Sequence, residues 1–139
     1  MKRRIGITRS TAIGLGLAAV AGVALAAVGG VLDTRFGNNG TVTTAIGGAG
    51  INEARAVTIQ VDNKIVVAGY APAALVGGAH FTLTRYNTGG TLDTTFSADG
   101  IVTTVVNSTK LEYATAIAIQ PDGKILVAGS NNTGGSTPG

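Results

Sequence analysis

The most constraining feature of this 139-residue sequence is a repeat with a period of sixty residues. A Leu-Asp-Thr motif at residue 32 returns at residue 92, and 18 of the 38 positions in 32–69 are identical in 92–129 without a gap. A fixed period of this kind is typical of folds in which similar supersecondary units stack on one another. The sequence therefore predicts a full repeat over about 32–91 and a partial repeat over 92–130.

Four stretches within each period have the composition of strands. Thr, Val, Ile and small residues concentrate in 40–46, 54–60, 64–70 and 80–87, and turn-forming residues separate them. The third stretch is too apolar to have a solvated face, so the sheets must be covered on both sides. We predict an all-β fold of four-stranded antiparallel blades, about two of them, stacked as in a partial β-propeller. A stacked open β-solenoid is the alternative, but sixty residues is long for one coil.

The first 26 residues have the organisation of a signal peptide. Four cations (Lys2, Arg3, Arg4 and Arg9) precede an apolar run over 12–28, and the small residues at 24–26 suit signal peptidase. We predict an N-terminal signal helix, cleavage after Ala26 and a secreted or cell-surface protein. An uncleaved membrane anchor is the alternative, because the apolar run approaches the roughly 20 residues of a spanning helix.

The positive charge lies in this leader, which has four cations and no acid, whereas the whole chain has a net charge of +3. From residue 27 onward six cations stand against seven acids, which gives 6 − 7 = −1 for the body, so we expect no nucleic-acid partner. The chain has no Cys and one His, which excludes disulfides, thiolate metal sites and multi-histidine clusters. A Gly-x-Gly-x-x-Ala match at 14–19 lacks a preceding predicted strand, so no dinucleotide cofactor is assigned.

The repeat motifs match those of a known family. Leu-Asp-Thr-x-Phe-x-x-x-Gly-x-Val-x-Thr is followed by Ala-x-Ala-x-x-Ile-Gln-x-Asp-x-Lys-Ile-x-Val-Ala-Gly, and then by Phe-x-Leu-x-Arg-Tyr-Asn at 81–87. This combination resembles the bacterial delta-60 repeat family, and the resemblance covers the segment that we assign to the repeats. It implies a secreted or cell-surface β-propeller with many repeats. It supplies no catalytic residue, because the repeat is not tied to a known activity.

Four acids recur with the period and are the first candidates for chemistry: Asp33, Asp62, Asp93 and Asp122. Calcium sites need six or more converging oxygens, and acid–base catalysis needs carboxylates brought close together. The sequence has no Asp-x-Asp-x-Asp loop. Because these acids return with the turns, we interpret them as turn-capping residues.

Other polar residues are weighed in the same way. His80 is interpreted as a surface residue, because no serine elbow or partner accompanies it. Arg85 and Tyr86 have the chemistry to contact a sugar, but we expect them to pack between blades with the Arg85 head at the rim. Three Asn-x-Ser/Thr sequons would carry glycans only in a eukaryotic secretory route: Asn39, Asn107 and Asn131.

The predicted function is that of a secreted or cell-surface β-propeller module, a non-enzymatic scaffold or binding module for protein or polysaccharide. We assign no catalytic, cofactor-binding or metal-binding residue and no cofactor. The expected partners are neighbouring propeller repeats or other copies of the chain, then a cell-surface protein or polysaccharide, and a membrane only if the leader is retained.

Two alternatives stay open. The chain is part of an extracellular propeller enzyme with its site in blade loops such as 71–79, or it is a truncated product without independent function. The enzyme alternative predicts a non-repeating acid, His or metal ligand, and we identify none from the sequence. The small, polar tail at 131–139 favours truncation.

Overall fold

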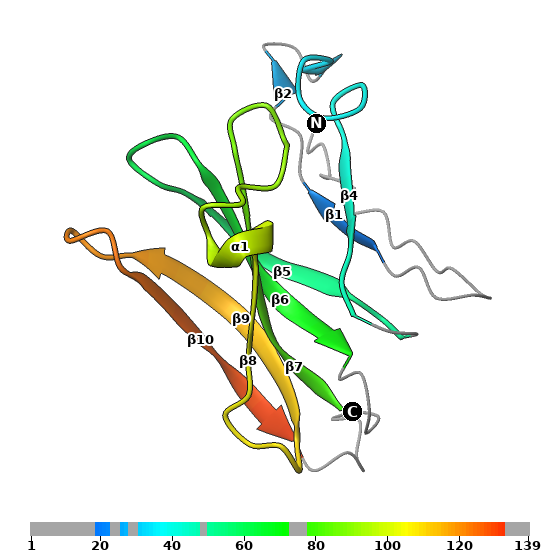
Figure 1. Ribbon diagram of the computed structural model, residues 1–139, viewed down its shortest axis with the longest axis vertical. Coiled ribbons are helices and arrows are strands. Elements are labelled where there is room, and N and C mark those ends of the chain that lie inside the picture. The colour runs from blue at the N-terminus through cyan, green and yellow to red at the C-terminus, as the bar shows by residue number, and fades with distance from the viewer. Residues whose placement is uncertain (1–18, 23–25, 28–30, 48–49, 73–77, 133–139) are drawn as a thin grey trace, which may run out of the picture.

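Figure 1 shows the chain in a computed structural model, which describes residues 19–22, 26–27, 31–47, 50–72 and 78–132. This described part is built from antiparallel strands, with one short helical turn, α1 (Ser97–Gly100). The prediction of an all-β chain is confirmed.

Four strands form the central sheet, in the order β5-β6-β7-β8. They are β5 (Glu53–Ile59), β6 (Ile65–Pro72), β7 (Ala79–Tyr86) and β8 (Ile101–Thr104). Each strand pairs antiparallel with the next strand along the chain. A four-stranded antiparallel sheet of this kind has the form of a propeller blade.

The turn between β5 and β6 has the chemistry that the sequence predicted. The Asn63 N–H donates to the Gln60 carbonyl at 2.9 Å, and Asn63 has a φ of 63°. Asn is one of the few residues other than glycine that tolerates this left-handed conformation. In the next repeat Gly123, with a φ of 82°, makes the same bond to Gln120.

The blade is out of phase with the sequence repeat, which corrects the predicted grouping of strands. The stretch 40–46 was expected to share a sheet with 54–60, 64–70 and 80–87. In the structure β4 (Val42–Ala45) pairs instead with β1 (Ala19–Gly22), and β8 from the next repeat completes the blade. The physical reason is that β7 turns tightly at 87–91, which brings the following segment back along the free edge of β7.

Two smaller sheets flank the blade. The hairpin of β9 (Leu111–Ile119) and β10 (Ile125–Asn132) lies on one side, and the β1–β4 pair lies on the other (Figure 1). A further short pair joins β2 (Ala26–Ala27) to β3 (Val31–Leu32). Both faces of the central sheet therefore have a neighbour, as the apolar third stretch required.

Apolar residues fill both layers. On the side of β4, a cluster joins Phe36 and Ile46 to Ile65, Val67 and Tyr86. On the opposite face of β6, Val66 and Ala68 are fully buried, and β9 lies against this sheet. Burial of this kind contributes about 25 cal/mol per Å² of apolar surface, so the flanking layers stabilise the blade.

Glycine is required where the pairing of β5 with β6 is irregular. The register shifts between Ala54 and Ala56, and a Cβ atom at Gly69 would lie 1.8 Å from the Glu53 carbonyl oxygen. The second hairpin has the same irregularity, and a Cβ at Gly129 would lie 2.0 Å from the Tyr113 carbonyl oxygen. The recurring Val-Ala-Gly motif is thus explained by a β-bulge that only glycine fits.

The predicted signal helix of residues 1–26 lies mostly outside the described residues. The described positions of that segment, Ala19–Gly22 and Ala26, belong to short strands, because their backbone groups pair with β4 and β3. Of the predicted tail 131–139, Asn131 and Asn132 are described, and they end β10 rather than forming part of a loop. None of the helical segments that the structure describes is long and apolar enough to cross a membrane.

Candidate functional site

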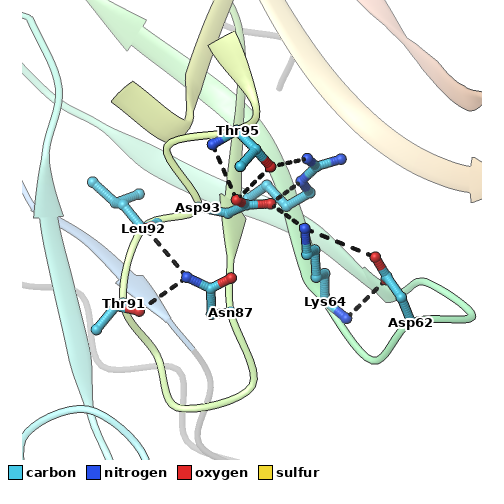
Figure 2. A network of polar contacts seen from close by, with 8 residues as sticks. Asp62, Lys64, Asn87, Thr91, Leu92, Asp93 and Thr95 are labelled. Atoms are coloured by element: carbon cyan, nitrogen blue, oxygen red, sulfur yellow. Dashed lines mark hydrogen bonds and ion pairs between the residues drawn. The ribbon is translucent and has the colours of Figure 1, made fainter. Parts of the chain in front are cut away.

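The most connected polar group is Asp93, which is only 3% exposed. Its Oδ2 atom lies 2.8 Å from Lys64 Nζ and accepts a hydrogen bond from Arg85 Nε at 2.7 Å. Its Oδ1 atom accepts from the Thr95 hydroxyl at 2.7 Å and from the Thr95 N–H at 3.1 Å. Figure 2 shows these groups gathered around the carboxylate, and we call the four residues the Asp93 network.

Lys64 and Thr95 have the largest influence on the charge state of the carboxylate. The hydrogen bond from Lys64, followed by that from Thr95, holds the pKa of Asp93 well below its usual range. Asp93 is therefore ionised at all physiological pH values and cannot act as a general acid there. Both of its oxygens are already engaged by protein donors. This chemistry is that of a structural link, which joins Lys64 and Arg85 of one repeat to the first turn of the next.

Neighbouring residues hold the Asp93 network in position. The guanidinium carbon of Arg85 lies 4.5 Å from the centre of the Phe96 ring, which sandwiches the cation between an aromatic face and a carboxylate. The Asn87 amide donates to the Thr91 hydroxyl at 3.1 Å and to the Leu92 carbonyl at 3.4 Å, so it fixes the turn that leads to Asp93 (Figure 2). Arg85 was expected to pack between blades with its head at the rim. In the structure its side chain is 17% exposed and its guanidinium is bound to Asp93.

All four recurring acids accept the N–H of the residue two positions later. The distances are 3.0, 3.2, 3.1 and 3.1 Å for Asp33, Asp62, Asp93 and Asp122 respectively. This is the Asx-turn geometry expected for turn-capping residues. The described residues contain no group of three or more His, Asp or Glu side chains that could hold a metal ion.

Asp33 occupies the place of Asp93 in the preceding copy of the repeat, but its surroundings differ. Arg35 stands where the second copy has Thr95, and its guanidinium lies 3.0 Å from Asp33 Oδ1. The hydrogen bonds from Arg35 lower the pKa of Asp33. The Asp33 side chain is nevertheless 31% exposed. The first copy therefore supplies its own cation within the turn.

The interpretation of His80 as a free surface residue is wrong. Its side chain is 12% exposed, and Nδ1 lies 3.3 Å from Oε2 of Glu112, which is fully buried. The other oxygen of Glu112 accepts the backbone N–H groups of Val106 and Asn107, the first at 2.9 Å. The reason is that His80 lies on β7 and faces β9, so the two side chains join the blade to the flanking hairpin.

Glu112 is the residue that sequence reasoning missed. It does not recur, because Asn52 occupies the equivalent position sixty residues earlier. Both polar side-chain atoms of Asn52 are buried and have no partner among the described residues. The available signal was an acid that breaks the repeat pattern next to a predicted strand.

Tyr86 and the aromatic residues of β6 and β9 link the layers. The Tyr86 hydroxyl is 2.7 Å from the buried Thr44 hydroxyl, a bond between β7 and β4. The Tyr70 and Tyr113 rings meet edge to face, with their centres 4.8 Å apart, and Arg55 lies within 6 Å of both. Such aromatic contacts contribute about 0.5–1.5 kcal/mol each beyond the buried area.

The remaining candidates are placed as follows. Asn39 has a φ of 52° in an exposed turn, Asn131 is exposed on β10, and Asn107 accepts from the N–H and hydroxyl of Thr109. Of the variable loop 71–79, residues 73–77 lie outside the described residues, as do residues 14–18 of the dinucleotide-like motif. A recess with a cavity volume of about 10 Å³, room for about one water molecule, lies beside Tyr70, Thr82 and Thr84. Typical ligand sites measure about 300–1,000 Å³.

Comparison with known proteins agrees with this architecture. A family model described as a domain of unknown function (DUF5122) beta-propeller matches residues 60–96 and 120–138, and the two matches begin sixty residues apart. No curated protein and no solved structure matches the chain. The repeat period, the four-stranded blade and the family match together support a β-propeller repeat family for this chain.

Proposed function

We propose that this chain is a delta-60-type propeller module, secreted or held at the cell surface, that serves as a non-enzymatic scaffold or binding module for protein or polysaccharide. The observation that carries the proposal is the Asp93 network. The polar residues that recur most regularly are used to cap turns and to join repeats, and Asp93 has no free oxygen to offer a substrate. A repeat built this way presents a rigid surface rather than a reaction centre.

The cationic and apolar leader supports export, because it has the three parts of a secretory signal. The test is expression of the chain with its own leader in a bacterial host, followed by fractionation. We expect the chain in the medium or the envelope fraction, shortened at Ala26. Its accumulation at full length in the cytoplasm would contradict the proposed location.

Binding is tested separately with the purified chain. We expect it to bind isolated envelope polysaccharide or envelope proteins in a sedimentation assay, without releasing a low-molecular-weight product. Val61→Ser tests the contribution of the exposed apolar surface and is expected to weaken binding, because this side chain is 98% exposed. Failure to bind any envelope component would contradict the binding role.

A propeller enzyme with its site between blades is the second candidate. The His80–Glu112 pair favours it, since a carboxylate that orients a His is a recurring element of acid–base catalysis. The test compares the hydrolysis of polysaccharide and ester substrates by the wild-type chain and by His80→Gln. Turnover that depends on His80 would replace the scaffold proposal.

A further inference from the structure

The two small sheets that flank the central blade are complementary halves of another blade. The pair β9–β10 repeats the first half, because Ile125 pairs with Ile119 as Ile65 pairs with Ile59, and both pairs of strands have a bulge at the following glycine. The pair β1–β4 repeats the second half. Thr43 and Thr44 pair with β1 as their equivalents Thr103 and Thr104 pair with β7.

Each half has one unused edge. Among the described residues, β10 pairs only with β9, and β1 pairs only with β4. Joining β10 to β1 would give the order β9-β10-β1-β4, which is the order of β5-β6-β7-β8 in the central blade. An open edge presents unpaired backbone donors and acceptors, so it favours pairing with another strand. The two halves lie on opposite sides of the central sheet, so one copy cannot join its own halves without displacing that sheet (Figure 1).

The two half blades also carry opposite charges at the positions that form an ion pair in the central blade. In the central blade, Lys64 of the first half reaches Asp93 of the second half. The equivalent residues are Lys124 on the β9–β10 hairpin and Asp33 before β4. The Lys124 side chain is 74% exposed and, within the described part of the chain, pairs only with Asp122 two positions earlier, while the Asp33 side chain is 31% exposed. Arg35 already occupies the part that Arg85 plays beside Asp93.

The exposed apolar residues fit the same arrangement. Leu126 is 57% exposed on β10, although its equivalent Val66 is fully buried against the next hairpin. Val57 and Ile59 on β5 are about half exposed, although their equivalents on β9 are partly buried. Docking of a second copy would place the Leu126 face of one copy against the Val57 and Ile59 face of the other.

We propose that this chain assembles head to tail, with β9–β10 of one copy and β1–β4 of the next forming a shared four-stranded blade in which Lys124 pairs with Asp33. Each copy then contributes one whole blade and two half blades, which makes two blades per copy. Propellers close with about four to eight blades. The assembly is therefore a closed ring of two, three or four copies. This inference uses the repeat architecture of the proposed function and does not depend on a ligand. It concerns the chain that retains its leader, because β1 (Ala19–Gly22) lies within residues 1–26 and cleavage after Ala26 would remove it.

The test is the mass of the full 139-residue chain in solution, by native mass spectrometry and light scattering. A copy has a mass of 13.7 kDa, and we expect a discrete species of two, three or four copies. Lys124→Glu places two acids together and is expected to weaken assembly about tenfold or more. Lys110→Glu is the matched control, since it makes the same charge change just before β9 begins, whereas Lys124 follows the end of β9, and it should leave the mass unchanged.

A mixing experiment separates a lost contact from a lost fold. Asp33→Lys is expected to fail to assemble alone, as Lys124→Glu does, because each creates a like-charge contact. Mixed in equal amounts, the two variants restore one opposite-charge pair at every junction, so rings with an even number of copies should re-form.

Three results would overturn the proposal: a monomeric wild-type chain, assembly that Lys124→Glu leaves unchanged, or growth into filaments without a discrete mass. If the wild-type ring has two or four copies, single variants that keep wild-type circular dichroism but do not assemble when mixed would also overturn it. A ring that binds no envelope component would contradict the proposed function and leave this inference standing.

Discussion

The hairpins β5–β6 and β9–β10 have nearly the same sequence but very different surroundings. Val66 is fully buried in the first, and Leu126 is 57% exposed at the same position of the second. Lys64 reaches the buried Asp93 of the following repeat, while Lys124 pairs with Asp122 in its own turn. The comparison shows that a repeat of this kind acquires its core and its ion pairs from its neighbour rather than from its own residues.

The two repeats differ in a buried charge at Glu112, whose counterpart is Asn52. Glu112→Ala leaves two backbone N–H groups and His80 without their buried acceptor, so we expect a loss of about 3–5 kcal/mol in the free energy of unfolding. Urea denaturation followed by circular dichroism measures it. Asn52→Ala is the matched control. Because the Asn52 side chain has no partner among the described residues, its removal should cost less than about 1 kcal/mol. Equal losses would refute a specific role for Glu112.

Two glycines sharpen the comparison at the level of the backbone. Gly69→Ala forces a Cβ atom against the Glu53 carbonyl inside a paired sheet, and we expect a loss of about 1–3 kcal/mol. Gly89→Ala is the control, because no atom lies within 4 Å of the added Cβ. Gly89→Ala should be neutral or should stabilise the fold by up to about 1 kcal/mol, because alanine lowers the conformational entropy of the unfolded chain. Thermal unfolding of both variants measures the difference, and a neutral Gly69→Ala would show that the bulge adapts.

The acids Asp93 and Asp33 should differ in their effect on acid stability. Since the folded pKa of Asp93 is depressed, its contribution is fully present above the unfolded pKa of about 3.9 and is lost as the pH falls from there through the folded pKa. Asp93→Asn should therefore flatten the fall of Tm between pH 4 and pH 2 and lower Tm at neutral pH.

Asp33→Asn should change that curve less, because Asp33 and Arg35 are exposed and such pairs are screened by solvent. At neutral pH we expect Asp93→Asn to lower the stability less than Glu112→Ala does. The reason is that the Lys64 side chain is 26% exposed and can turn toward water when it loses its partner. A scan of Tm against pH for the three proteins measures both effects. Identical curves for the two variants would show that burial of Asp93 has no consequence.

The smallest predicted effect is in the two hairpin turns. Asn63 and Gly123 have the same left-handed conformation, with φ of 63° and 82°. Gly123→Asn should change the free energy of unfolding by no more than about 0.5 kcal/mol, while Gly123→Ala should cost about 1–2 kcal/mol. Urea denaturation distinguishes them. An Asn variant as unstable as the Ala variant would mean that the turn requires glycine for another reason.

Local features of this chain could be predicted from the sequence. The strands β5, β6 and β7 and the Asx turns follow from alternation, turn residues and the recurrence of Asp, all of which act within a few residues. The grouping of β8 with β7 could not be predicted in this way, because it depends on which free edge the chain reaches after the turn at 87–91.

Among the polar residues, local contacts could likewise be predicted and long-range contacts could not. The turn-capping role of Asp62 follows from its own turn, whereas the pairing of His80 with Glu112 depends on how a blade faces the next hairpin. Nothing within a few residues of His80 indicates an acid 32 positions away. A charged residue that does not recur, at a position within the repeat, is the sequence signal for such a contact between layers.

The offset between the blade and the repeat has a practical and an evolutionary consequence. A duplication or deletion of the segment 32–91 cuts through a sheet and transfers its last strand to a different neighbour. Each added copy then gives a strand to the sheet of the copy before it. Every repeat in the array is therefore joined to its neighbour by strand pairing as well as by the connecting chain. An engineer who wants a separable unit should instead cut the gene around residues 53–104.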